Sequence, residues 1–274
     1  MDLHAADPSV PADMKGLLVR WDEVAPRLAG LADACTDRRL LHRLDEVQLL
    51  PPVPEPGRYL DFISFEGHVK ASRARRGLDM PKEWYQNPTY YNGNPYSFVG
   101  HSGTVRYPVG EKERDYELEL AVVVRRAVRD LKPEAWRDAV AGYTLLNDSS
   151  ARGLQFPYAK VGMGPAYGKD FGKALGPWIV TLDECPDPAR IELVARINGK
   201  EWSRGRFEPH YDWGAMLAFA TQGQELRPGD VVGAGTLPGG CGYEQGRFLE
   251  PGDTVEMEML YEGKALGTLT TKVA

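Results

Sequence analysis

The chain has 274 residues, which suits one large domain or one domain with a small appendage. Its 42% hydrophobic and 26% charged residues are typical of an ordinary globular protein. The net charge of −6 argues against a nucleic-acid partner, because the one basic run, RARR at 73–76, is short. No apolar run has the length of a membrane span, so we expect no membrane association.

The cysteines and the first residues indicate a compartment. The chain has an odd number of cysteines, Cys35, Cys185 and Cys241, and none of them shows C-x-x-C spacing. This favours reduced thiols. The sequence begins with the polar, acidic stretch MDLHAADPSV, which is unlike the basic start of a secretory signal. We therefore expect a cytoplasmic protein.

The first part of the chain is predicted to be helical. Residues 12–34 carry apolar side chains at helical spacing, and Pro26 predicts a kink or break within that helix. The stretch LLPPVPEPGRY at 49–59 is too rich in proline for a continuous helix or a central strand. We therefore predict a linker there.

After the linker, strand-like patterns dominate. Two helices are expected among them, at about 133–141 and at 212–222, the second capped by Asp212. Apolar or alternating runs predict strands and a final hairpin at 59–65, 116–124, 192–197, 230–236 and 253–273.

The order of these elements predicts the fold class. Strands outnumber helices and do not alternate with them regularly, so a doubly wound parallel sheet is excluded. The pattern predicts an α+β fold that is mostly β. We place a small N-terminal region and linker at 1–58 and a catalytic, metal-binding domain at 59–274.

Four carboxylates stand in or beside the predicted strands. Glu117 and Glu119 are two residues apart in RDYELELAVVV, so a strand points both to the same face. Asp61 and Asp148 stand within or at the end of two further apolar runs. Taken singly, each is best explained as an exposed acid. Gathered together they would repel one another and lose hydration, and a hard cation such as Mg²⁺, Ca²⁺ or Mn²⁺ would compensate them.

Three further residues are candidates for chemistry. His68 follows Asp61 by seven residues, and it is either a surface loop histidine or a general base, since its ordinary pKa is about 6.5. Lys169 stands in the glycine-rich YGKDFGKALGPW, where it is either solvated or a fixed charge for an anionic substrate or enolate. Thr236 follows a strand in GAGTLPGG, whose glycines let backbone N–H groups approach a ligand.

Five motifs resemble, in this order, those of the fumarylacetoacetate hydrolase family: DYELELAVVV, GYTLLNDSSARGLQ, GKDFGKALGPWIV, LRPGDVVGAGTLPGG and LEPGDTVEMEM. The resemblance covers roughly residues 48–272. It implies a mixed, mostly β sandwich roll behind a smaller N-terminal region, commonly as a homodimer. It also implies carboxylate-bound Mg²⁺ or Ca²⁺, with Mn²⁺ as a further option, and a place in aromatic catabolism. The family's reactions are C–C hydrolysis of diketo or acylpyruvate acids, decarboxylation of oxaloacetate-like acids and isomerisation of enol acids.

The resemblance also implies roles for individual residues. By motif, the metal ligands are Glu117, Glu119 and Asp148. Small decarboxylase-like members carry a glutamate three residues after their histidine, where this chain has Ala71. Fumarylacetoacetase instead has an aspartate ligand seven residues before its histidine. Asp61 and His68 match that arrangement, which makes Asp61 the fourth ligand.

The positions that contact substrate in fumarylacetoacetase also have counterparts here. Its substrate-binding tyrosine segment is similar to YYNGN around Tyr91. An arginine after the histidine binds substrate, and Arg73, Arg75 and Arg76 are candidates, with Arg76 preferred. The remaining counterparts are Gln155, Tyr158, Lys169 and Thr236.

The acid partner of His68 stays open. Fumarylacetoacetase supplies a glutamate from a C-terminal segment that this shorter chain largely lacks. Glu244, in GCGYEQGR, or Glu66 could take its place. If no acid orients His68, hydrolysis becomes less favoured than decarboxylation or isomerisation.

From these residues we predict a metal-dependent hydrolase that cleaves a C–C bond in a 1,3-diketo acid, such as fumarylacetoacetate or an acylpyruvate. His68, oriented by Glu244, takes a proton from water, and Lys169 stabilises the departing enolate. One alternative is a decarboxylase or tautomerase of a β-keto or enol acid at the same site. A second alternative is a non-catalytic protein that binds a small keto acid.

Overall fold

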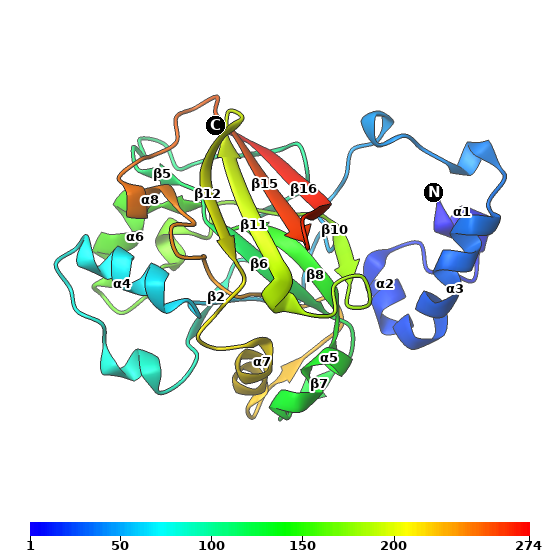
Figure 1. Ribbon diagram of the computed structural model, residues 1–274, viewed down its shortest axis with the longest axis horizontal. Coiled ribbons are helices and arrows are strands. Elements are labelled where there is room, and N and C mark those ends of the chain that lie inside the picture. The colour runs from blue at the N-terminus through cyan, green and yellow to red at the C-terminus, as the bar shows by residue number, and fades with distance from the viewer.

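Two β-sheets form the body of the molecule in the computed structural model, which describes all 274 residues (Figure 1). The larger sheet has seven strands in the order β2-β1-β14-β6-β8-β10-β3, and the smaller has five in the order β12-β11-β15-β16-β4. The larger sheet contains β1 (Tyr59–Phe62), β2 (Tyr90–Gly93), β3 (Phe98–Val99), β6 (Leu118–Val124), β8 (Val140–Asn147), β10 (Lys173–Thr181) and β14 (Val231–Gly233). The smaller contains β4 (Gly103–Val105), β11 (Ile191–Ile197), β12 (Lys200–Arg206), β15 (Thr254–Tyr261) and β16 (Lys264–Val273).

Two short strand pairs and the helices complete the structure. The pairs are β5 (Arg114–Asp115) with β9 (Ser150–Ala151), and β7 (Val128–Arg129) with β13 (Glu225–Leu226). The α-helices are α1 (Leu3–Ala6), α2 (Met14–Val19), α3 (Trp21–Ala34), α4 (Glu66–Ala74), α5 (Trp136–Ala139), α6 (Arg152–Ala159), α7 (Trp213–Thr221) and α8 (Gly242–Gln245). The 3-10 turns are η1 (Arg38–Leu40), η2 (Leu44–Glu46), η3 (Lys82–Tyr85), η4 (Pro133–Ala135), η5 (Ala166–Gly168) and η6 (Pro188–Arg190).

Side chains of both sheets form one continuous hydrophobic core. On β6, Leu120 and Val122 point into this core, so the alternating Ala121 and Val123 point to the opposite face of the larger sheet. That second face is covered by Leu18 of α2 and by the linker. Strands therefore dominate both faces of the core, and the prediction of a mostly β, α+β fold is confirmed.

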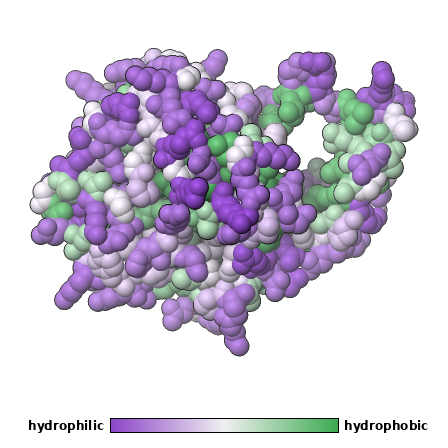
Figure 2. Space-filling view, viewed as in Figure 1, coloured by the Kyte–Doolittle hydropathy of each residue, from purple (hydrophilic) through white to green (hydrophobic).

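The N-terminal helices lie beside the sheets, at the right of Figure 1. The predicted break at Pro26 is wrong, because Pro26 lies inside α3 and the helix is interrupted at Arg20 instead. Pro26 is exposed, so the backbone carbonyl that lacks its usual N–H partner can be hydrated. In the segment that follows, Leu41, Leu44 and Leu50 are exposed, and Figure 2 shows hydrophobic residues at the surface of this part.

The linker and the two later helices follow the sequence pattern closely. Residues 47–58 contain no helix or strand, although Pro51 and Val53 are buried against the body. The helix expected at 133–141 is a 3-10 turn followed by α5, and it ends where β8 begins. No helix in the protein combines the length and the apolar character needed to cross a membrane.

The helix α7 gives a test of the fold. Asp212 caps it by accepting a hydrogen bond from the backbone N–H of Ala215 at 2.8 Å. Asp212→Ala is expected to lower the free energy of unfolding by about 1 kcal/mol, because that N–H loses its acceptor. Urea denaturation followed by circular dichroism measures this change. Asp212→Asn keeps an acceptor and should stay near wild type, so an equal loss in both variants would contradict the capping role.

Candidate active site

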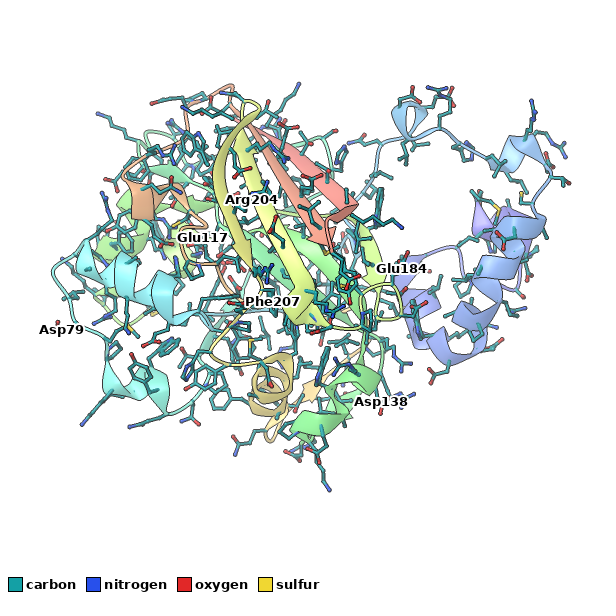
Figure 3. The ribbon with its side chains drawn as sticks, in the orientation of Figure 1. Asp79, Glu117, Asp138, Glu184, Arg204 and Phe207 are labelled. Atoms are coloured by element: carbon teal, nitrogen blue, oxygen red, sulfur yellow. The ribbon has the colours of Figure 1, made fainter.

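One cavity of about 440 Å³ collects most of the residues singled out from the sequence. Its walls come from β1, α4, β2, the start of β6, α6 and the loop after β14. Figure 3 shows Glu117 in the body of the molecule, on the side of α4 and α6 and away from the N-terminal helices. The predicted site residues that line the cavity are Asp61, His68, Arg76, Tyr91, Glu117, Glu119, Gln155, Lys169 and Thr236.

Strand order brings the acids together. In the order β1-β14-β6-β8, Asp61 lies on β1, Glu119 lies on β6 and Asp148 directly follows β8. Between β1 and β6, the residue beside Asp61 is Gly233. A Cβ atom at Gly233 would lie 2.5 Å from Asp61 Oδ1, so glycine leaves the space that this carboxylate occupies.

Three of the carboxylates form a compact oxygen cluster. Ligand atoms of Asp61, Glu119 and Asp148 all lie within 4.8 Å of one another, and all three residues are buried. Asp61 Oδ1 and Glu119 Oε2 have no hydrogen-bond partner, although buried polar atoms normally have one. An all-oxygen donor set with unpaired buried atoms fits Mg²⁺, Ca²⁺ or Mn²⁺. The structure therefore contains an acidic site suited to a hard cation.

Proximity perturbs the acidity of this cluster. Burial, followed by repulsion from Asp148, raises the pKa of Asp61 well above its ordinary value. Burial also raises the pKa of Glu119, with Asp61 and Asp148 adding to the effect. A cation bound between these groups would favour their ionised forms, since it supplies the opposite charge.

Glu117 has a different environment from the other acids. It accepts a hydrogen bond from Arg152 Nη2 at 2.7 Å and forms an ion pair with Lys169, which also pairs with Asp148. Burial opposes ionisation of Glu117, but Lys169, Arg152 and His68 together hold its pKa well below the ordinary value. Burial also disfavours the charged form of Lys169, yet Asp148 and Glu117 raise its pKa above the ordinary value. The surrounding charges therefore favour the ionised form of both groups.

His68 has an acid partner. Its Nδ1 lies 2.7 Å from Glu244 Oε1, while Glu244 Oε2 accepts a hydrogen bond from the Gly239 N–H at 2.9 Å. The competing candidate, Glu66, faces away and bonds to Tyr85 and Lys70 instead. The structure thus brings Glu244 rather than Glu66 to the histidine.

The orientation of the imidazole follows from that contact. With Nδ1 held by Glu244, the other ring nitrogen of His68, Nε2, lies 3.9 Å from Glu117 Oε1 at the cavity wall. A carboxylate at one ring nitrogen fixes the ring orientation and favours a proton on that nitrogen. The second nitrogen is then free to accept a proton from a group in the cavity.

The arginine candidates are separated by their positions. Arg73 and Arg76 line the cavity, with the Arg76 guanidinium 4.5 Å from the centre of the Phe156 ring. Arg75 instead lies over the ring of Tyr243, 4.9 Å from its centre, and does not line the cavity.

The other predicted substrate residues differ in their contacts. Tyr91 donates a hydrogen bond to Asp148 Oδ1 at 3.2 Å, and Thr236 donates one to Glu119 Oε1 at 3.0 Å. Gln155 accepts a hydrogen bond from Arg152. Tyr158 does not line the cavity: it is exposed and packs on Tyr167, with ring centres 4.4 Å apart.

Comparison with known families identifies the fold around this cavity. Residues 59–274 match the family model described as the C-terminal domain of fumarylacetoacetate hydrolase. The chain belongs to the fumarylacetoacetate hydrolase family. The family assignment drawn from the sequence motifs is therefore confirmed, and an enzyme is the expected kind of protein.

Family members named for different reactions resemble the chain. It is 31% identical over 264 residues to the mitochondrial oxaloacetate tautomerase fahd2 of Xenopus laevis, covering 94% of this chain and 79% of that protein. The fumarylacetoacetate hydrolase of Exiguobacterium antarcticum superposes with a TM-score of 0.75 at 27% identity, covering 97% and 89% of the two chains. The 2-hydroxyhepta-2,4-diene-1,7-dioate isomerase of Mycobacterium marinum superposes with a TM-score of 0.66 at 28% identity, covering 84% and 79%.

Two buried, positively charged side chains beside the cavity were not singled out from the sequence. Arg152 pairs with Asp115 and Glu117, and Lys173 pairs with Asp148. Charged residues are usually exposed, so neither one stands out when it is considered alone. The available signal was their position inside two of the family-like motifs, GYTLLNDSSARGLQ and GKDFGKALGPWIV.

The buried Arg152 pairs give a stability test. The Arg152 side chain is only 2% exposed, and both carboxylates that it contacts are buried as well. Arg152→Met is expected to lower the free energy of unfolding by about 3–5 kcal/mol, because it leaves Asp115 without its cation. Arg204→Met removes surface ion pairs and should cost less than about 1 kcal/mol. Equal losses of unfolding free energy in the two variants, measured by urea denaturation, would contradict the importance of burial for the Arg152 ion pairs.

Proposed function

We propose that the protein is a divalent-cation-dependent tautomerase or isomerase of a small β-keto or enol dicarboxylic acid, such as oxaloacetate. Similarity to an oxaloacetate tautomerase and to a dienedioate isomerase supports proton transfer as the main reaction. This ranks the tautomerase alternative above the C–C hydrolase that we predicted first from the sequence.

The oriented His68 is the observation that carries the proposal. Its Nδ1 is held by Glu244 at 2.7 Å, and its Nε2 lies at the wall of the cavity. An imidazole nitrogen at the cavity wall can accept a proton from a substrate and return it. Keto–enol interconversion needs one such group beside the acidic C–H, and no water attack is required.

The acidic site would hold the cation. Asp61, Glu119 and Asp148 supply the clustered oxygens. Glu117 lies outside this cluster but shares the ion-pair partner Lys169 with Asp148, and it is the proposed fourth ligand. A bound Mg²⁺, Ca²⁺ or Mn²⁺ ion acts as a Lewis acid that polarises a carbonyl group. Lys169 reaches both Glu117 and Asp148, so its ammonium group stands where it can stabilise an enolate oxygen.

The polar lining of the cavity would bind the ends of the substrate. Arg76 lines the cavity with a charge suited to a carboxylate, and Gln155 and Thr236 add polar groups. Tyr91 is proposed to contact the substrate from β2. Tyr158 would join this set only if α6 or its own side chain moved inward, because it packs on Tyr167 here.

Hydrolysis of a C–C bond is the second candidate, and the same histidine favours it. Cleavage of a 1,3-diketo acid requires a base that takes a proton from water, and Glu244 gives His68 the acid partner that this role needs. The similarity to a fumarylacetoacetate hydrolase supports this candidate. Product analysis separates it from tautomerisation, since hydrolysis yields two acids.

The cation and the reaction can be tested together. Purified protein with Mg²⁺ or Mn²⁺ is incubated with oxaloacetate, fumarylacetoacetate and an acylpyruvate. We expect faster enol–keto interconversion of oxaloacetate by ultraviolet absorbance without a change in mass. A chelator or Glu119→Gln should abolish this rate, whereas Glu262→Gln, an exposed acid, should keep it.

Other results of this assay have defined meanings. Two acid fragments would show the hydrolase, and CO₂ would show a decarboxylase. No turnover of any compound would favour the binding-only alternative. Full activity of Glu119→Gln in the presence of chelator would contradict the cation site.

The His68–Glu244 contact gives a separate kinetic test. Glu244→Gln is expected to lower kcat by about a hundredfold, because general acid–base catalysis contributes about 10²–10⁴ and an amide orients the imidazole poorly. Glu66→Gln, the matched control on α4, should leave kcat within a factor of about two, since Glu66 does not touch the histidine. A larger loss of kcat in Glu66→Gln than in Glu244→Gln would contradict the assignment of Glu244 as the partner of His68.

A further inference from the structure

Lys173 is a buried ammonium group behind the acidic site. It is the first residue of β10, and the next residue, Ala174, pairs with Asn147, the last residue of the antiparallel β8. Lys173 therefore lies opposite Asp148, which directly follows β8. The Lys173 side chain is fully buried and pairs with Asp148 Oδ1. Its Nζ also donates a hydrogen bond to the backbone carbonyl of Lys169 at 3.0 Å.

Aromatic rings complete the surroundings of this ammonium group. The Lys173 Nζ lies 5.2 Å from the ring centre of Tyr59 and 5.4 Å from that of Tyr91. Both distances are within the range of cation–π attraction. A carboxylate, a carbonyl and two rings therefore compensate a charge that would otherwise be costly to bury.

The two lysines on Asp148 differ in their access to substrate. Lys169 pairs with Asp148 Oδ2 and lines the cavity, whereas Lys173 pairs with Oδ1 and does not line it. Lys169 can therefore face a substrate. Lys173 can act only through the groups that it holds, namely the Asp148 carboxylate and the Lys169 backbone.

The sum of the charges in the cluster indicates how Lys173 affects the site. With their carboxylates ionised, Asp61, Glu117, Glu119 and Asp148 carry four negative charges, and Lys169 and Lys173 together carry two positive charges. Arg152 and Asp115 pair with each other and leave the balance unchanged. Among these four acids and the cationic side chains that pair with them, the excess of two negative charges equals the charge of one divalent cation. Glu244 pairs with His68 and is not counted in this set.

We propose that Lys173 is a positioning residue that holds Asp148 and matches the charge of the site to a divalent cation. This inference rests on the proposed cation site and concerns the selection of ion charge. Without Lys173 the excess would be three negative charges. A trivalent cation would then gain more than a divalent one, because Coulomb energy scales with ion charge.

The relative affinities of the protein for a divalent and a trivalent ion test the role of Lys173. Mn²⁺ binding is measured from the electron paramagnetic resonance of free Mn²⁺, and Tb³⁺ binding from luminescence excited through tyrosine. In Lys173→Met, the preference for Tb³⁺ over Mn²⁺ is expected to rise at least about tenfold over wild type, because one unit of positive charge close to the ion is removed. Lys173→Arg keeps the charge, and Lys264→Met changes an exposed lysine, so both should keep the wild-type ratio.

The ratio distinguishes charge matching from a purely structural role, which would weaken both ions alike. Lys173→Gln removes the charge but retains polar contact with Asp148, so it should show the same rise if Lys173→Met does not fold. An unchanged ratio in a folded neutral variant, or loss of both ions from it, would overturn the proposal. Absence of Mn²⁺ binding in wild type would instead overturn the cation site itself, and the inference with it.

Discussion

Burial of four carboxylates on one sheet is the constraint on which the rest of the site depends. Each of these groups is at most 3% exposed, so hydration is weak and the fold must compensate their repulsion in other ways. It does so with Lys169, Lys173 and Arg152, each of which is buried and contacts at least one of the four acids. When all four acids are ionised, these lysines and this arginine leave an excess of negative charge, and the unpaired oxygens are the place where a cation would balance it.

Strand geometry sets the direction of Glu119 and Lys173 in this balance. Alternation along β6 sends Leu118 and Leu120 into the core between the sheets, so Glu119 points to the other face. On β10, Ala174 points into the same core, so the preceding residue, Lys173, points to the opposite face of the larger sheet. Hydrophobic packing on one face of the larger sheet thus holds the charged groups in place on the other.

Local patterns were sufficient for the elements but not for their convergence. The strands that carry Asp61 and Glu119 were predicted from alternation, and α7 was predicted from its cap and apolar pattern. That the two acids meet depends on β14 lying between β1 and β6, with Gly233 leaving the space. Strand order is set by long-range packing, so spacing along the chain could not show it. The family resemblance supplied this information instead.

The contact between His68 and Glu244 is a second case in which local sequence patterns could not predict which residues meet. The two residues are 176 positions apart, and Glu244 lies on a four-residue helix with no strong sequence pattern. Nothing local distinguishes it from Glu66, which is only two residues from the histidine and faces away. The family-based prediction named Glu244 and kept Glu66 as an alternative, and the packing of α8 against α4 brings Glu244 to the histidine.

The two proposed reactions share their early steps. Tautomerisation and C–C cleavage both need a base at the cavity wall, and both develop negative charge on an enolate oxygen. His68 with Glu244 can supply the first, and Lys169 with the acidic site can supply the second. The reactions differ in whether water fits beside the substrate. Arg73, Arg76 and Phe156 line the cavity, and the room that they leave for water beside the substrate would decide between the two reactions.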